Sequence, residues 1–149
     1  MFRSGLALLH ADLGRLEEAR ESFDALAVDQ FRALPRDVNW LNAMDELAQV
    51  CAALGDREHA ATLYALLLPY ADQNVVVAFA DACEGSVSRY LGLLATTAGR
   101  WDAAARHFEA ALAMNQRIRA RPLLAVTAVN HALAGCPAPS GEEQADRRR

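Results

Sequence analysis

The chain has 149 residues, 53% hydrophobic and 23% charged, with a formal net charge of −4. This length and composition predict one globular domain rather than a disordered chain. All 15 basic residues are arginine, which excludes a phosphate-binding P-loop and lysine-based covalent chemistry. The negative charge argues against a surface made mainly for nucleic acid.

The three cysteines, Cys51, Cys83 and Cys136, are odd in number and far apart. This argues against a disulfide framework or a zinc site and favours reduced thiols. No apolar run reaches the roughly 18–20 residues that span a bilayer. Asp12 and Gly14 fall where a signal peptide would need its apolar core and cleavage site. We therefore expect a cytoplasmic protein without a membrane span, a metal or a cofactor. The arginine-only, alanine-rich composition is typical of a GC-rich bacterial genome.

Glycines recur along the chain at intervals of about 40 residues, which is the size of helical repeats. They are Gly14, Gly55, Gly99 and Gly135. The same residue types surround the first three of them. A leucine precedes each glycine, an alanine follows, and an aromatic comes one helical turn later: Leu6, Ala19 and Phe23; Leu47, Ala60 and Tyr64; Leu91, Ala104 and Phe108. We interpret each set as a helix pair that turns at its glycine.

In chain order, the pattern predicts pairs over residues 1–34, 37–71 and 85–119, and a last helix over 122–134. In the first pair, Glu17 and Glu18 fall in the first turn of the second helix, which is predicted to run to about residue 31. Asp37 is the expected N-cap of a helix over 38–54. The polar segment 137–149 has two prolines and no apolar periodicity, and we expect it to be disordered.

Residues 72–84 are ambiguous. The run Asn74–Phe79 has the β-branched residues of a strand, but we find no partner for it elsewhere in the chain. The segment is interpreted as an extended link that packs apolar side chains, or as an extra turn of helix.

These repeats resemble tetratricopeptide repeats in the order of leucine, turn glycine, alanine and aromatic. The amino-acid sequence of residues 90–122 is similar to the C-terminal helical-repeat region of LuxR-type ATPase regulators and of nucleotide cyclases with a central ATPase. The resemblance covers about residues 1–134 and implies an all-α, right-handed superhelix of about seven helices. It implies a regulatory interaction module and brings no catalytic residues.

By the same resemblance, the first helix of each pair lines a concave groove for a peptide or small molecule. Counting back from the turn glycines places six candidate contacts there: Asn42, Asp45, Gln49, Arg89, Leu93 and Thr97. The alternative is an ordinary solvated helix face.

The last helix predicts an association surface, because its polar stripe is narrow, namely Thr127, Asn130 and His131. Its apolar residues are too many to pack on one neighbour: Leu123, Leu124, Val126, Val129 and Leu133. We expect this helix to pair with a second copy or a partner domain. The alternative is that the C-terminal segment folds over it.

Signals for catalysis are weak. Asp56 and His59 have the i, i+3 spacing of di-iron bundles, but such sites need a second motif and further carboxylates. We expect both side chains to face solvent at a helix start. The sequence predicts a non-enzymatic protein-interaction module, with a small-ligand sensor of a split transcriptional or cyclase regulator as the alternative.

Overall fold

The computed structural model describes residues 2–77 and 82–135. The predicted all-α class is confirmed, because seven α-helices occupy most of these residues: α1 (Phe2–Asp12), α2 (Leu16–Ala27), α3 (Trp40–Leu54), α4 (Arg57–Leu67), α5 (Val87–Thr97), α6 (Trp101–Arg117) and α7 (Arg121–Ala134). Within the described ranges, none of the helices combines the length and apolar character needed to span a bilayer. The disorder predicted for residues 137–149 concerns a segment outside the described residues.

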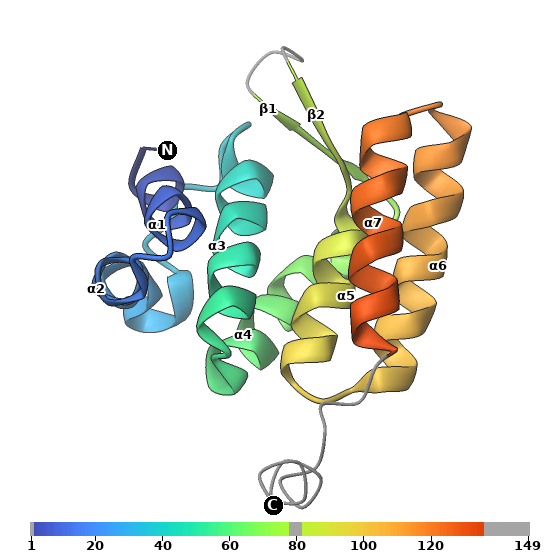
Figure 1. Ribbon diagram of the computed structural model, residues 1–149. Coiled ribbons are helices and arrows are strands. Elements are labelled where there is room, and N and C mark those ends of the chain that lie inside the picture. Colours follow the sequence, from blue (N-terminus) through green and yellow to red (C-terminus); the bar gives the residue numbers. More distant parts are fainter. Residues whose placement is uncertain (1, 78–81, 136–149) are drawn as a thin grey trace, which may run out of the picture.

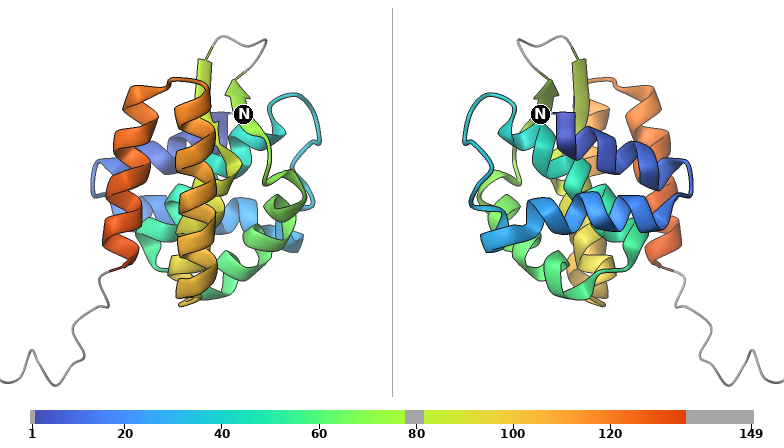
Figure 2. Two further views of the ribbon diagram at one scale, coloured as in Figure 1. Left: turned by 90° about the vertical axis from the view of Figure 1, so that its right-hand side faces the viewer. Right: turned by 90° about the vertical axis from the view of Figure 1, so that its left-hand side faces the viewer.

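The helices pack in sequence order from one end of the molecule to the other. Helix α3 contacts α1 and α5, and α5 contacts α7, while α2, α4 and α6 each pack against the helix that precedes them. Consequently α1 and α2 form one end and α6 and α7 the other (Figure 1). Figure 2 views these two ends in turn. The right-handed superhelix stays a prediction.

Three of the four turn glycines behave as expected. Gly14, Gly55 and Gly99 have φ values of +72°, +64° and +74°, a left-handed conformation that suits glycine at a helix end. Gly135 differs, because it ends α7 in a right-handed conformation at φ −76°. Gly135 is also the glycine around which the repeated alanine and aromatic residues are absent.

The repeated small and aromatic residues form the interior. Ala19, Ala60 and Ala104 are fully buried, and so are the aromatics Phe23 and Phe108. These small residues let neighbouring helices approach closely, and the aromatics fill the space between them.

The repeated leucines do not share one environment. Leu47 and Leu91 are fully buried, whereas Leu6 is 48% exposed. Leu6 lies on the outer side of α1, where no described helix covers it. The same place in the repeat therefore does not give the same burial.

The described residues on either side of 78–81 form a pair of antiparallel strands, which we call the hairpin and which corrects the extended link or extra helical turn expected there. Strand β1 (Asn74–Val77) pairs with β2 (Ala82–Ser86), with Asn74 opposite Ser86 and a bulge between Val75 and Val76. A partner for the valine run therefore exists. We missed it because β2 contains a glycine and a glutamate and few typical strand formers.

The helix boundaries differ from prediction at two places. Helix α2 ends at Ala27, and the 3-10 segment Val28–Phe31 contains left-handed residues such as Gln30 (φ 55°), so the predicted continuous helix to residue 31 is wrong. Helix α3 begins at Trp40 with Asn39 as its N-cap. Asp37, the predicted N-cap, lies two residues before Asn39, and its Oδ1 accepts a hydrogen bond from the Asn39 amide at 2.9 Å. The predicted acidic start of α2 is confirmed.

Candidate functional site

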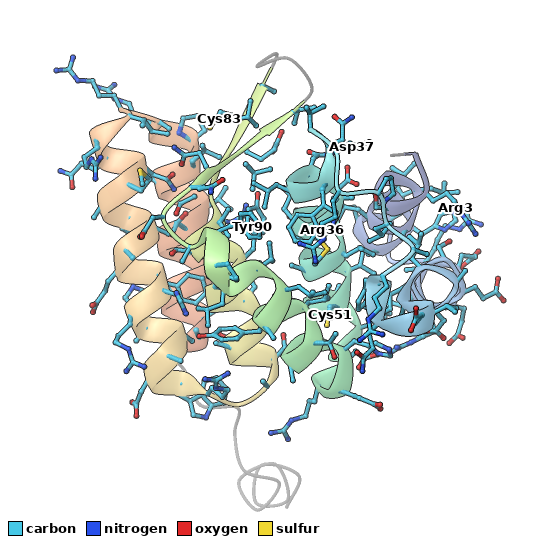
Figure 3. All side chains as sticks on the ribbon, turned by 180° about the vertical axis from the view of Figure 1, so that it is seen from behind. Arg3, Arg36, Asp37, Cys51, Cys83 and Tyr90 are labelled. Atoms are coloured by element: carbon cyan, nitrogen blue, oxygen red, sulfur yellow. The ribbon has the colours of Figure 1, made fainter. Side chains whose placement is uncertain are left out.

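Four of the six predicted groove residues lie together, three on one face of α3 and Arg89 on α5, and the cluster reaches α7 through Asn130. Asn42, Asp45 and Arg89 are buried, and Gln49 is half-buried. With two residues that sequence reasoning missed, they form the polar cluster: Asn42, Asp45, Glu46, Gln49, Arg89 and Asn130. Tyr90 marks its position in Figure 3, at the start of α5 below the hairpin.

Arg89 links three helices through neutral partners. Its Nη2 donates to Gln49 Oε1 on α3 at 3.4 Å, and its Nε donates to Asn130 Oδ1 on α7 at 3.1 Å. The guanidinium carbon lies 4.7 Å from the centroid of the Tyr90 ring. Among the described residues, no carboxylate lies within 4.0 Å of Arg89. The arginine therefore orders the cluster through hydrogen bonds and cation–π contact.

The acidic side of the cluster is short of hydrogen bonds. Asn42 Nδ2 donates to Glu46 Oε1 at 3.2 Å, but Asp45 Oδ1 and Glu46 Oε2 are buried without a hydrogen-bond partner. Burial raises the pKa of Asp45 to about 8, and the nearby negative charge of Glu46 adds to this rise. Burial therefore favours the protonated, neutral form of Asp45 over the carboxylate.

The other two predicted groove residues lie apart from the polar cluster. Thr97 Oγ1 donates to the Leu93 carbonyl oxygen on its own helix at 2.9 Å. Both residues line an open cavity of about 400 Å³ together with Arg57 and Trp101. The predicted groove is thus two regions, one closed by hydrogen bonds and one open to solvent.

Helix α7 has its polarity inverted relative to an ordinary surface helix. Its polar residues face inward: Thr127 is fully buried and accepts a hydrogen bond from Asn115 Nδ2 at 3.1 Å, Asn130 binds Arg89, and His131 stacks on Phe108 with centroids 5.7 Å apart. The sequence revealed this polar stripe but not its direction.

The predicted association residues divide into two groups by exposure. Leu123 and Leu124 are half-buried, so only part of the predicted association surface is exposed. Leu123 packs over Gly85 at the base of the hairpin. Val126, Val129 and Leu133 are 44%, 57% and 68% exposed. They follow each other at i, i+3 and i+7 and form one outer stripe, which we call the α7 stripe.

The Asp56–His59 pair has a structural role. The Asp56 carboxylate caps α4 by accepting from the His59 amide at 3.0 Å, contacts His59 Nδ1 at 2.9 Å, and pairs with Arg20 of α2. Burial alone would raise the pKa of Asp56, but the hydrogen bonds from His59 and Arg20 outweigh it and lower the pKa to about 2. The side chains of Asp56 and His59 are only 11% and 30% exposed, so the expectation that they face solvent is wrong.

Cys51, beside this pair, lacks the properties of a nucleophile. Its Sγ donates to the Asp56 carbonyl oxygen at 3.2 Å, and burial raises its pKa to about 12. Within the described part of the chain, no three histidine, cysteine, aspartate or glutamate side chains form a group that could hold a metal ion.

A cavity of about 270 Å³ lies between the start of α6 and the end of α7. Trp101, Asp102, Ala105, His131 and Ala134 line it. It combines an aromatic wall with one carboxylate and one imidazole, which suits a single small ring. No family model, no curated protein and no solved structure matches this chain, so the tetratricopeptide resemblance stays a prediction based on the repeated residues.

Proposed function

We propose that this chain is a non-enzymatic protein-interaction module of a regulatory kind, which associates through its terminal helix and holds a partner segment along α3 and α5. The observation that carries the proposal is the inverted polarity of α7. Its outer stripe of Val126, Val129 and Leu133 is exposed while its polar side chains are buried.

The energetics favour association through this face. Burying a valine or leucine side chain stabilises a contact by about 1.5–3 kcal/mol. The exposed residues between and beside the α7 stripe are also small or apolar: Pro122, Ala125, Ala128 and Ala132. No charged side chain would have to be desolvated there, which is the composition of the centre of a protein interface.

The partner segment would lie beside the polar cluster rather than within it. Arg89 is buried and bonds Gln49 and Asn130, so we assign it the role of fixing the angle between α3, α5 and α7. The open cavity at Leu93 and Thr97 supplies accessible apolar surface on α5, outside the polar cluster. A cytoplasmic setting fits the unpaired thiols of Cys51 and Cys83.

Light scattering over a protein concentration series tests the association. We expect the mass of the full chain to exceed the 16.2 kDa of one chain as concentration rises. Val129→Glu should restore the mass of one chain, because it places a carboxylate in the α7 stripe. Val38→Glu is the matched control, since Val38 is 64% exposed and lies outside α7. Equal masses for the wild type and Val129→Glu at every concentration would contradict association through α7.

A small-ligand sensor is the second candidate, supported by the cavity at Trp101, Asp102 and His131. A panel of small aromatic acids and amines should then shift the indole N–H resonance of Trp101. Trp40 is the internal control, because it is buried among other residues. A panel that moves neither resonance, or both equally, would count against this candidate.

A further inference from the structure

At the opposite end of the molecule, helix α1 also exposes a row of large apolar side chains. On α1, the small residues Ser4 and Ala7 are buried, whereas Leu6, Leu9 and Leu13 are 48%, 52% and 62% exposed. These leucines also follow each other at i, i+3 and i+7, and we call them the α1 stripe. The molecule therefore exposes two apolar stripes of equal spacing. The helices that carry them, α1 and α7, lie at opposite ends of the molecule (Figures 1 and 2).

The two ends carry opposite charge. Residues 2–27, which include α1 and α2, contain five carboxylates and three arginines. Residues 101–134, which include α6 and α7, contain four arginines and two carboxylates. Three of these arginines, Arg117, Arg119 and Arg121, are exposed where α6 passes into α7. The first end is therefore complementary in charge to the last.

This charge distribution selects between two ways of covering the α7 stripe with a second copy. A two-fold contact of α7 with α7 would bring two positively charged ends together, which is unfavourable. A contact of α7 with α1 brings opposite charges together over two apolar stripes. The chain's own segment 136–149 is a poor occupant, since it contains no leucine, valine, isoleucine or aromatic residue.

We propose that copies of this chain associate head to tail, with the α7 stripe of one copy packed against the α1 stripe of the next. This inference rests on the proposed association through α7 and adds the second surface. Because the two contact surfaces differ, each added copy again presents a free stripe at both ends of the assembly. The assembly grows with concentration unless it closes into a ring.

Two single variants and their mixture test the arrangement by light scattering. Leu9→Glu and Val129→Glu should each weaken self-association by at least about tenfold. Mixed in equal amounts, they should form a complex of two chains and nothing larger. The intact α7 stripe of Leu9→Glu can bind the intact α1 stripe of Val129→Glu, and the two remaining stripes are both blocked.

One variant serves as the control, and each contrary result contradicts a different part of the proposals. Val38→Glu should associate like the wild type, and added salt should weaken association because opposite charges meet at the contact. If Val129→Glu becomes one chain while Leu9→Glu still associates, the head-to-tail arrangement is overturned and the proposed association through α7 stands. A mixture that stays at the mass of one chain also overturns the arrangement. A wild type that stays at that mass overturns both proposals.

Discussion

The two sides of helix α5 are built in opposite ways. Toward α6, Gly92 lies against Phe108, so close that an added Cβ would come within 2.6 Å of Phe108 Cε1. Toward α3 and α7, Arg89 reaches Gln49 and Asn130 through hydrogen bonds. The first side derives its stability from close packing, and the second derives its geometry from polar contacts. The comparison shows that one helix can be fixed to its neighbours by both means.

The largest effect is expected on the packed side. Phe108→Ala should lower the free energy of unfolding by about 3–5 kcal/mol, because it leaves a cavity among fully buried residues. Urea unfolding followed by circular dichroism measures this change. A loss below about 1 kcal/mol would contradict the packed contact.

Gly92→Ala tests the close packing of α5 against Phe108, because its effect on stability should depend on the size of that side chain. Alone it should destabilise by about 1–3 kcal/mol through overpacking. In a Phe108→Leu background much of that cost should disappear, because the smaller side chain leaves room. Gly5→Ala in α1 is the matched control: its added Cβ would lie 3.4 Å from Glu46 Oε1, an ordinary contact, so it should be neutral or slightly stabilising.

On the polar side, Asp45→Asn should stabilise the protein in a pH-dependent way. Folding raises the pKa of Asp45 from 3.8 to about 8, so the folded state loses stability as pH rises through this window. The asparagine variant should match the wild type near pH 4 and exceed it near pH 7 by at most about 4 kcal/mol. Urea unfolding at several pH values tests this, with exposed Asp12→Asn as the control. A difference that does not change with pH would contradict a buried, protonated Asp45.

Arg89→Met should have a smaller effect of about 1–3 kcal/mol. It keeps the apolar stem but leaves the oxygens of Gln49 and Asn130 without their donor. The loss of stability caused by Arg89→Met should be smaller in an Asn130→Ala background, since one of the two oxygens left without a donor is then absent. Arg106→Met, at an exposed arginine of α6, should change stability by less than about 0.5 kcal/mol. Equal effects of the two arginine variants would contradict a structural role for Arg89.

The smallest expected effect is at His107, at the edge of the packed side. Its Nε2 lies 2.7 Å from the Tyr64 hydroxyl, and burial lowers its pKa from 6.5. Stability contributed by neutral His107 is therefore lost as pH falls below 6.5, which is the opposite sign to Asp45. His107→Gln should reduce this acid sensitivity by less than about 1 kcal/mol. Titration of the His107 ring by NMR checks the direction, and a pKa above 6.5 would contradict it.

Much of the fold could be predicted from local patterns. The spacing of Ala60, Tyr64 and their equivalents indicated the helices, and Gly14, Gly55 and Gly99 indicated the turns. The hairpin could not be predicted in this way. The valines of β1 pair with a strand that contains Gly85 and Glu84, and contacts outside the two strands support that pairing, since Val75 is buried in the core and Leu123 packs over Gly85.

Part of the candidate site could also be predicted. Asp45, Gln49 and Arg89 were placed on one face by helical counting, and the structure brings them together. Glu46 and Asn130 were missed, because one lies beside the counted positions and the other comes from a helix distant in sequence. Asn130 belongs to the polar stripe of α7 that the sequence revealed, but the sequence did not show whether that stripe faces the interior or the solvent.

The sequence by itself determined which segments become helices and where they turn. Those choices depend on backbone preferences and on residues three or four positions apart. Only the tertiary structure decided which face of each helix is covered. Leu6 and Leu91 occupy the same place in the repeat, yet only Leu91 has helices on both sides. Burial depends on neighbours from the whole chain, and for this reason the division of the predicted α7 residues into an exposed stripe and two half-buried leucines emerged only from the folded molecule.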